Sequence, residues 1–433
     1  MQHALQPAPS LLTIEGARVA RSAYNAKYRT ITICGPTIES VSMTGMDPLR
    51  PASGLAIDLS GYTVLPGLIN AHDHLDFSIF PRMGHGHYAN WHDWATDIHR
   101  SEQPSIEVCL RVPRQSRILW GGVRNLLCGV TTVSHHNPYS PQVFENGFPV
   151  HVPAEYGWAH SLADIRQVPE RLRQSPSNWP FILHLGEGSD EASQRELDVL
   201  ESLVPLNERL LLVHCVGLSP RQWERIARAG TGIIWCPSSN LHTLGRTITA
   251  DRILSISNIA LGSDSPLTAA GDLLDEVRIA HDRFDMPASL VYDLVTSRAA
   301  RLLRLNSGQG SLVAGSKADI LVTCDRQLTP AETLVRLSWR DIDLVMKGGK
   351  IMLLSSSMAA RIPRVLQQGM ERVCIDGVER LVRAPVRQLI RETSEKLGRT
   401  AAISQREVSL PEPQEPMCAK YKDFPMPEAQ FLS

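Results

Sequence analysis

Short runs rich in valine, isoleucine and leucine alternate with helix-length amphipathic segments over residues 67–306. Continuous apolar runs of this kind are typical of strands buried on both faces, and their alternation with helices indicates parallel strands with helices packed outside. The length and the repetition favour a (β/α) barrel of the TIM type over an open sheet. The sequence therefore predicts an α/β fold with seven clear strands and one that is irregular or missing. We expect these strands at residues 67–71, 130–134, 149–155, 181–185, 210–215, 232–236 and 259–263.

Both ends of the chain carry a different pattern, in which short β-type runs are interrupted by glycine and proline. Such punctuation is typical of strands joined by turns. Neither end has enough strands to close a core alone, so we predict one small composite β-sandwich domain from residues 1–66 and 307–390. The barrel domain would occupy residues 67–306, and residues 391–433 would form a C-terminal helix and an extended Pro/Glu-rich tail.

Composition excludes several classes of partner. The 433 residues carry a formal net charge of -1, which does not fit an electrostatic footprint for nucleic acid. No run approaches the roughly 18–20 apolar residues that cross a bilayer, so no membrane partner is expected. The eight cysteines are scattered without a CxxC pair, and the amino-terminal stretch lacks the pattern of a signal peptide. We therefore expect a cytoplasmic protein with reduced cysteines.

Histidines and a carboxylate stand where the predicted strands end. The segment "LPGLINAHDHLDF" closes an apolar run with His72 and His74, which point the same way because side chains alternate along a strand. His184, His214 and Asp264 close three later runs. Barrel enzymes place their chemistry at this carboxyl edge. Imidazoles with one carboxylate suit a borderline divalent cation, so we predict one metal ion, Zn²⁺ in preference to Fe²⁺.

The same segments resemble motifs of the metal-dependent amidohydrolase superfamily, and most closely its cytosine deaminase-like branch with guanine deaminase and the triazine hydrolases. The resemblance rests on "PGLINAHDHL", "HLGE", "VHCVGLS", "CPSSN", "LGSDSPL" and "GSLVAGSKADILV", in this order, within about residues 10–355. It implies a metal-dependent hydrolase barrel with a β-sandwich formed where the chain leaves and re-enters it.

Carried over to this chain, the resemblance implies that His72, His74, His184 and Asp264 bind the metal ion. Glu187 would be the proton shuttle and His214 would face the attacking water or the substrate, so the implied catalytic residues are Glu187, His214 and Asp264. In an alternative binuclear site, Glu155 would bridge two metals and His214 would become a ligand.

Substrate contacts are expected from residues that follow neighbouring strands. We predict His136, Tyr156, Trp158 and Asn240, because histidine and aromatic side chains at this edge can hold a planar ring. Asp73, between the two histidines, should point away from the metal and have little effect on it.

The leading functional hypothesis is hydrolytic deamination of an aminated N-heterocycle by metal-bound hydroxide, with a small-molecule substrate and a homodimeric protein. Hydrolytic opening of a cyclic amide or imidazolone uses the same residues, because pocket shape selects the leaving group. A superfamily scaffold that has lost catalysis is the non-enzymatic alternative, and metal content would separate it from an enzyme.

Overall fold

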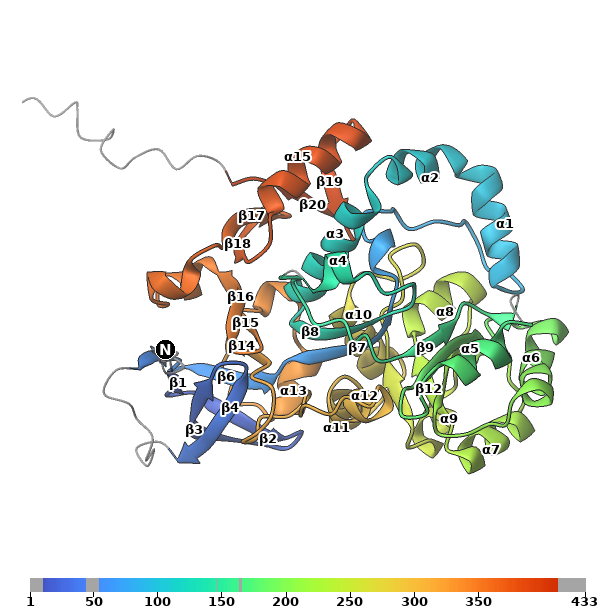
Figure 1. Cartoon of the computed structure of the whole chain (residues 1–433), viewed down its shortest axis with the longest axis horizontal. Helices are drawn as coiled ribbons and strands as arrows, with labels where there is room; N and C mark the ends of the chain where they lie inside the picture. Colours follow the sequence, from blue (N-terminus) through green and yellow to red (C-terminus); the bar gives the residue numbers. More distant parts are fainter. Residues whose placement is uncertain (1–10, 44–53, 146, 163–165, 412–433) are drawn as a thin grey trace, which may run out of the picture.

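The computed structural model describes residues 11–43, 54–145, 147–162 and 166–411. Its central part is a barrel of parallel strands with helices on the outside (Figure 1). Strand β7 pairs with β8, and β9 to β13 lie side by side in chain order, all in parallel. A hydrogen bond from Asp264 N to His72 O, 3.0 Å long, joins the segment after β13 to β7. The strands are β7 (Leu68–Asp73), β8 (Val130–His135), β9 (Gly157–Ala159), β10 (Phe181–Leu185), β11 (Leu210–His214), β12 (Gly232–Trp235) and β13 (Ile259–Leu261).

The outer helices begin and end at residues that favour those positions. Helix α7 starts with a capping box, in which Ser219 and Gln222 satisfy each other's backbone N–H groups, and it ends at Gly230 with a φ of 69°. Its polar outer face and buried Trp223 are typical of a helix packed on a barrel. The main helices of the barrel region are α1 (Trp91–Ser101), α2 (Gln103–Leu110), α3 (Arg114–Leu127), α5 (Val168–Gln174), α6 (Glu191–Leu203), α7 (Pro220–Ala229), α8 (Pro237–Leu244), α9 (Ala250–Ser255), α10 (Leu273–Arg278), α11 (Ala288–Leu294) and α12 (Ser297–Leu302).

One predicted strand is wrong. Residues 149–155 contain no strand, and only His151 makes an isolated parallel bridge, with Thr132. Pro149 and Pro153 lack the backbone N–H that a ladder requires, so pairing stops on both sides of this bridge. A regular strand forms a few residues later as β9, which the sequence pattern did not reveal.

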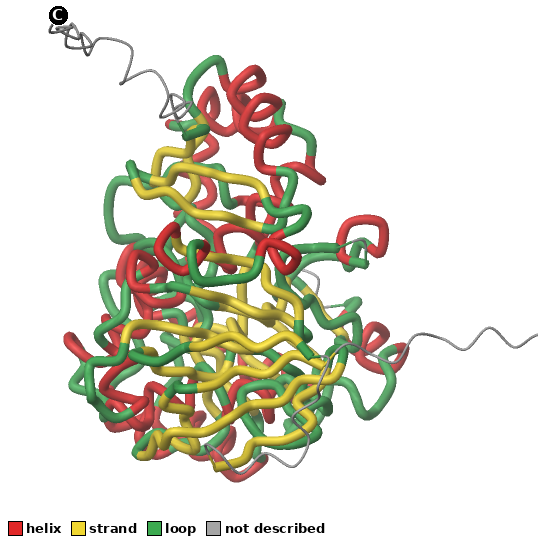
Figure 2. Tube along the Cα trace, turned by 90° about the vertical axis from the view of Figure 1, so that its left-hand side faces the viewer, coloured by secondary structure: helices red, strands yellow, loops and turns green. Residues whose placement is uncertain are grey.

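The two ends of the chain meet in one large sheet (Figure 2). Strand β6 from the first part pairs antiparallel with β14 from the last part, and Leu65 lies opposite Leu321. An apolar cluster beneath this sheet mixes Ile14 and Ile31 with Ile320 and Leu344. The strands are β1 (Leu11–Glu15), β2 (Arg18–Ser22), β3 (Asn25–Cys34), β4 (Thr37–Met43), β5 (Leu55–Asp58), β6 (Tyr62–Pro66), β14 (Ile320–Cys324), β15 (Leu344–Lys347), β16 (Lys350–Ser355), β17 (Glu371–Ile375), β18 (Val378–Val382), β19 (Ala401–Ile403) and β20 (Arg406–Ser409).

The last described part of the chain returns to the barrel. After α15 (Val386–Leu397), where a helix was expected, the hairpin of β19 and β20 pairs with β17. Arg406 of this hairpin forms an ion pair with Asp272, 2.7 Å long, in the loop that follows β13. The sequence pattern predicted an extended tail here, and the Pro/Glu-rich stretch from residue 412 lies outside the described residues.

The sequence predicted neither membrane-spanning helices nor disulfide bonds. Within the described ranges, no helix combines the length and the apolar character that crossing a bilayer demands. The described cysteines are free thiols, and Cys418 lies outside the described residues.

Candidate active site

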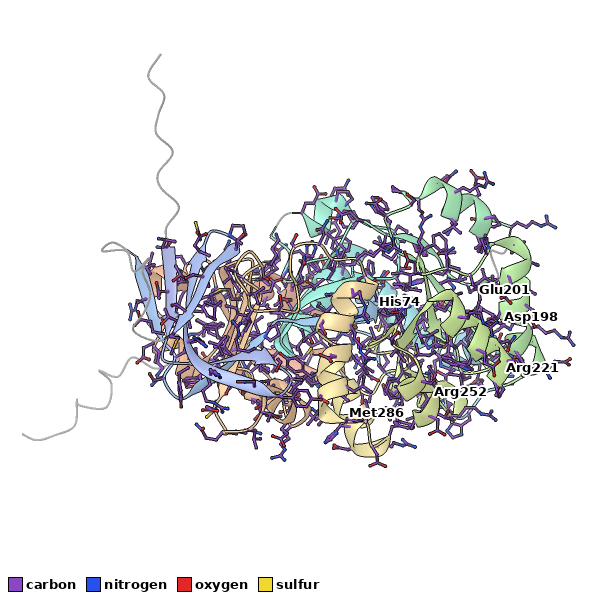
Figure 3. All side chains as sticks on the ribbon, turned by 90° about the horizontal axis from the view of Figure 1, so that it is seen from below. His74, Asp198, Glu201, Arg221, Arg252 and Met286 are labelled. Atoms are coloured by element: carbon purple, nitrogen blue, oxygen red, sulfur yellow. The ribbon has the colours of Figure 1, made fainter. Side chains whose placement is uncertain are left out.

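The predicted metal ligands converge at the carboxyl ends of the barrel strands. The Nε2 atoms of His72 and His184 are 3.2 Å apart, and Asp264 Oδ1 lies 3.7 Å from His72 Nε2. The Nε2 atom of His74 is also 3.7 Å from Asp264 Oδ1. These side chains come from β10 and from the ends of β7 and β13, and all are buried. Figure 3 shows His74 toward the middle of the molecule, whereas Asp198 and Glu201 of α6 lie at its outer edge.

Two of these strand ends have a left-handed backbone. His214 has a φ of 73° and Asp264 a φ of 55°, a region that residues other than glycine seldom adopt. Such a conformation costs about 1–3 kcal/mol per residue and persists only where the surroundings enforce it. The bond from Asp264 N to His72 O contributes to that enforcement. We infer that this backbone strain is tolerated because it directs the side chains of His214 and Asp264 toward the same point.

The protonation states of the predicted ligands are those that bind a divalent cation. Burial, reinforced by neighbouring imidazoles, lowers the pKa of His72 and His184 well below the ordinary value, so both rings are neutral. Burial would raise the pKa of Asp264, but His214, His74 and a hydrogen bond from Ser239 hold it below its usual range. Neutral imidazoles and an ionised carboxylate are the forms that bind metals. Because nitrogen and oxygen lone pairs face one another here, the donor set fits a divalent cation.

His136 also belongs to this cluster. Its nitrogen lies within 4.8 Å of ligand atoms of His72 and His184, and a second group of the same size comprises His72, His74 and Asp264. His136 Nε2 is 3.1 Å from the carbonyl oxygen of Ala159, and its Nδ1 is buried without a hydrogen-bond partner. The structure therefore places His136 against the predicted ligands rather than on the cavity wall.

Glu187 and His214 face each other beside the cluster. Glu187 Oε2 lies 3.5 Å from His214 Nε2. Burial raises the pKa of Glu187 to about 7, in opposition to the effect of His214. Gly186, with a φ of 64°, lets the chain turn between His184 and Glu187 so that the carboxyl group enters the cavity. This carboxyl group can hold or release a proton near neutral pH.

Asn240 orients His214. Its Oδ1 accepts a hydrogen bond from His214 Nδ1, 2.7 Å long, while its Nδ2 donates to Thr247. Because the amide oxygen can only accept, His214 Nδ1 carries a proton in this bond, and the Nε2 atom faces Glu187. The sequence predicted Asn240 as a substrate contact, and the structure instead shows it behind the histidine.

The aromatic residues predicted to bind substrate lie elsewhere. Tyr156 is buried, and its hydroxyl donates to the carbonyl oxygen of Asn137, 2.7 Å away. Trp158 packs against His136 at 5.4 Å between ring centroids and lies under the guanidinium of Arg171. Neither lines the cavity beside the cluster. Glu155, the alternative bridging ligand, is exposed and lines a separate cavity with Arg304 and Lys317.

Asp73 has partners that its sequence position did not reveal. It is fully buried and forms an ion pair with Arg124 of α3. Asn125, next to Arg124 on the same helix, donates to the same carboxylate oxygen at 2.7 Å. The expectation that Asp73 points away from the metal ligands agrees with these contacts, and Asp73 belongs to a buried charged network behind the predicted ligands.

That network reaches the other side of the cluster. Arg124 Nη2 also donates to the carbonyl oxygen of Asp264 at 3.3 Å. Asn70 of β7 donates to Asn125 at 2.9 Å and to Ser263 Oγ at 2.8 Å, and it accepts a bond from Ser263 N at 3.0 Å. The ends of β7 and β13 are therefore held to each other and to α3. Contacts between residues so far apart in the sequence leave no periodic signal, so only the structure could reveal them.

A cavity of about 380 Å³ opens beside the cluster. His74, His184, Glu187, His214 and Asp264 line one side of it. The rest of its wall comes from the segment after β7, from α1 and α2, from the loop after β13, and from Asn137, His160 and Ser161. A concave site with convergent polar groups and an apolar wall is the usual form of a small-molecule pocket.

Comparisons with known proteins agree with this geometry. The Amidohydrolase family matches residues 182–352. A 5-methylthioadenosine/S-adenosylhomocysteine deaminase of Pyrococcus abyssi is 28% identical over 218 residues, which cover 45% of this chain and 50% of the relative. A protein of the same name from Syntrophus aciditrophicus is 30% identical over 198 residues, which cover 40% of this chain and 45% of the relative. The chain thus spans about half the length of the curated relatives it matches.

Solved structures share the fold over most of the chain. An adenosine deaminase from Xanthomonas campestris with bound zinc has a TM-score of 0.68 at 17% identity, covering 90% of this chain and 98% of that one. A triazine hydrolase from Arthrobacter aurescens has a TM-score of 0.66 at 17% identity, covering 90% and 99%. The Amidohydrolase family match over residues 182–352 and the shared fold agree with the motif resemblance to the metal-dependent amidohydrolase superfamily.

The ligand cluster predicts a specific loss of metal. Protein purified without chelator is expected to contain about one divalent ion per chain, and His184→Ala should lose most of it, because a neutral imidazole is removed from the centre of the cluster. Elemental analysis measures both. His85→Ala, at an exposed histidine in the loop before α1, is the matched control and should retain its metal. Equal metal content in the two variants would contradict the assignment of His184.

The Asp73–Arg124 pair predicts a large stability effect. Arg124→Met leaves a buried carboxylate without its cation, which typically costs about 3–5 kcal/mol. Chemical denaturation should show that loss, and the added substitution Asp73→Asn should recover part of it by removing the unpaired charge. Arg195→Met, at an exposed pair with Glu191, is the control and should cost at most about 1 kcal/mol. A loss in Arg124→Met no larger than in the control would refute the network.

Proposed function

We propose that the protein is a metal-dependent aminohydrolase that removes the amino group of an aminated N-heterocycle by hydrolysis. The main support for this proposal is the position of Glu187, whose carboxyl group lies 3.5 Å from His214 beside the imidazole–carboxylate cluster. Both residues line a cavity that can hold a small molecule. The relatives' names, which refer to deamination of adenosine derivatives, support an aminated purine nucleoside as the substrate class.

We assign the metal site to His72, His74, His184 and Asp264, with zinc as the preferred ion. The neutral state of His72 and His184 and the ionised state of Asp264 support this assignment. A divalent cation bound there lowers the pKa of a water molecule toward neutrality and so supplies a nucleophile. His136 is the further imidazole within reach of His72 and His184, and a role for it as a substrate contact remains a prediction.

The protein's own groups account for the proton movements. As water oxygen bonds to the amidine carbon, protonated Glu187 gives its proton to the adjacent ring nitrogen, and Asp264 accepts one proton of the water. Glu187 recovers a proton from the added hydroxyl group as the carbonyl forms. The proton on Asp264 then passes to the amino nitrogen, the C–N bond breaks, and ammonia leaves. His214, fixed by Asn240, stands beside the reacting carbon and holds Glu187 in place.

The two carboxyl groups need different protonation states for these roles. Asp264 is held ionised by the histidines and Ser239, whereas burial keeps Glu187 able to carry a proton at neutral pH. Environments that separate two neighbouring pKa values in this way are typical of acid–base pairs in enzymes.

Glu187→Gln is expected to lower kcat by at least about 10²–10⁴-fold, because Gln has the same shape but no proton to exchange. In the wild type, kcat/KM should fall as the pH rises above about 7, since the acid form of Glu187 is present below its raised pKa and lost above it. Ammonia release from a panel of aminated heterocycles measures both. Glu191→Gln, at an exposed glutamate nearby, is the control and should keep wild-type rates. Turnover in Glu187→Gln within a few-fold of wild type would make Glu187 a structural residue.

The same assay separates the alternatives. Ring opening would yield an open-chain product without ammonia, and a scaffold would yield neither product. Cytoplasmic location and a homodimer remain predictions from the sequence.

A further inference from the structure

The cavity beside the catalytic groups has a second, apolar side. We name this side the apolar lobe and define it by Phe77, Phe80, Trp94, Ala95, Ile98 and Ile106. Phe77 and Phe80 come from the segment after β7, and the other residues come from α1 and α2. The lobe belongs to the same cavity as Glu187 and Asp264, so one molecule can occupy both sides.

The side chains of the apolar lobe are held in place by packing and by a hydrogen bond. Phe77 and Phe80 meet edge to face with 5.3 Å between ring centroids, and Ile98 is 4% exposed. Trp94 Nε1 donates to the carbonyl oxygen of Met83 at 3.1 Å, which fixes the indole. The first residue of α1, Trp91, donates its backbone N–H to the carbonyl oxygen of Glu187 at 3.0 Å. This bond sets the position of the lobe relative to the catalytic carboxyl group.

The lobe offers little to a charged ligand. Among the described residues, no lysine or arginine lines the cavity. Arg117, whose guanidinium lies over the Phe80 ring, donates to the carbonyl oxygen of Asp76 at 2.9 Å. Arg82 Nε donates to the carbonyl oxygen of Thr268 at 3.2 Å. The carboxylates on the cavity wall, Glu187 and Asp264, are those that the chemistry uses. A ligand carboxylate placed in this lobe would lose its water without gaining a cation, which is costly.

We propose that the apolar lobe binds an uncharged apolar arm of the substrate, attached to the heterocycle that faces Glu187. The proposal rests on the proposed function and narrows its substrate class. It sets this protein apart from relatives whose name joins 5-methylthioadenosine with S-adenosylhomocysteine. The former carries a methylthio arm without charge, whereas the latter carries an arm that ends in an amino acid.

The expected preference for 5-methylthioadenosine follows from burial of its apolar methylthio group. A pocket gains about 10–200-fold in kcat/KM for one further apolar group that it encloses. We therefore expect 5-methylthioadenosine to exceed adenosine, in which a hydroxyl group replaces the methylthio group, by at least about 10-fold. We expect it to exceed S-adenosylhomocysteine by at least the same factor.

The test uses the full-length protein with its metal and these three nucleosides as probes. Ammonia release gives kcat/KM for each, and isothermal titration with Glu187→Gln gives the dissociation constants without turnover. Both series should rank 5-methylthioadenosine first. Similar values for all three would overturn the apolar-arm proposal and leave the deaminase function standing.

Two variants at neighbouring positions of α1 test whether the substrate arm binds in the apolar lobe. Ala95 lines the lobe and is half-buried, whereas its neighbour Thr96 is exposed and does not line it. Ala95→Arg places a guanidinium where the arm would end, so the preference for 5-methylthioadenosine over S-adenosylhomocysteine should fall at least about 10-fold. Thr96→Arg adds the same charge outside the cavity and should keep the wild-type ratio. Equal ratios in the two variants would overturn the location.

Failure of the proposed function gives a different result. If none of the three nucleosides releases ammonia but titration keeps the order, the deaminase function fails and the lobe assignment stands. If none of them binds, both proposals are overturned.

Discussion

Asp73 and Arg124 form a buried ion pair directly behind the candidate metal site, and the directions of the neighbouring histidines depend on it. Asp73 lies between His72 and His74 at the end of β7, so its ion pair with Arg124 holds the backbone from which both imidazoles project. Arg124 also donates to the backbone carbonyl oxygen of Asp264 and thereby helps to hold the backbone of the third strand end. A buried pair is seldom a net source of stability, but it tolerates few alternative arrangements. Its consequence here is geometric, because two strand ends are fixed relative to one helix.

The electrostatics of the site follow from that geometry. Burial keeps the His72 imidazole neutral, whereas His214, His74 and a hydrogen bond from Ser239 hold the pKa of Asp264 below its usual range. Burial raises the pKa of Glu187 to about 7, in opposition to the effect of His214. One fold thus separates the pKa values of two carboxyl groups that line the same cavity. The apolar lobe forms another part of the wall of the same cavity.

The sequence predicted the superfamily and the barrel because both depend on local patterns. Apolar runs that end in His72, His184, His214 and Asp264 can be recognised one strand at a time. Contacts between distant segments could not be recognised in this way. Nothing near Asp73 indicates Arg124, and nothing near His214 indicates Asn240. The prolines around His151 show that local propensity can also mislead, since an apolar run there forms no strand. Tyr156 and Trp158 were predicted as substrate contacts from their aromatic character, but the aromatic rings that line the cavity come from α1 and from the segment after β7.

We propose that the carboxyl ends of β7, β10 and β13 hold one metal ion next to the Glu187 carboxyl group. Anomalous scattering from crystals of the protein grown with zinc tests it most directly. We expect one strong peak in contact with His72, His74, His184 and Asp264, within reach of the Glu187 carboxyl group. A peak bound by His136 in place of His74 and Asp264 would contradict the ligand assignment. The absence of any peak among these side chains would contradict the account as a whole.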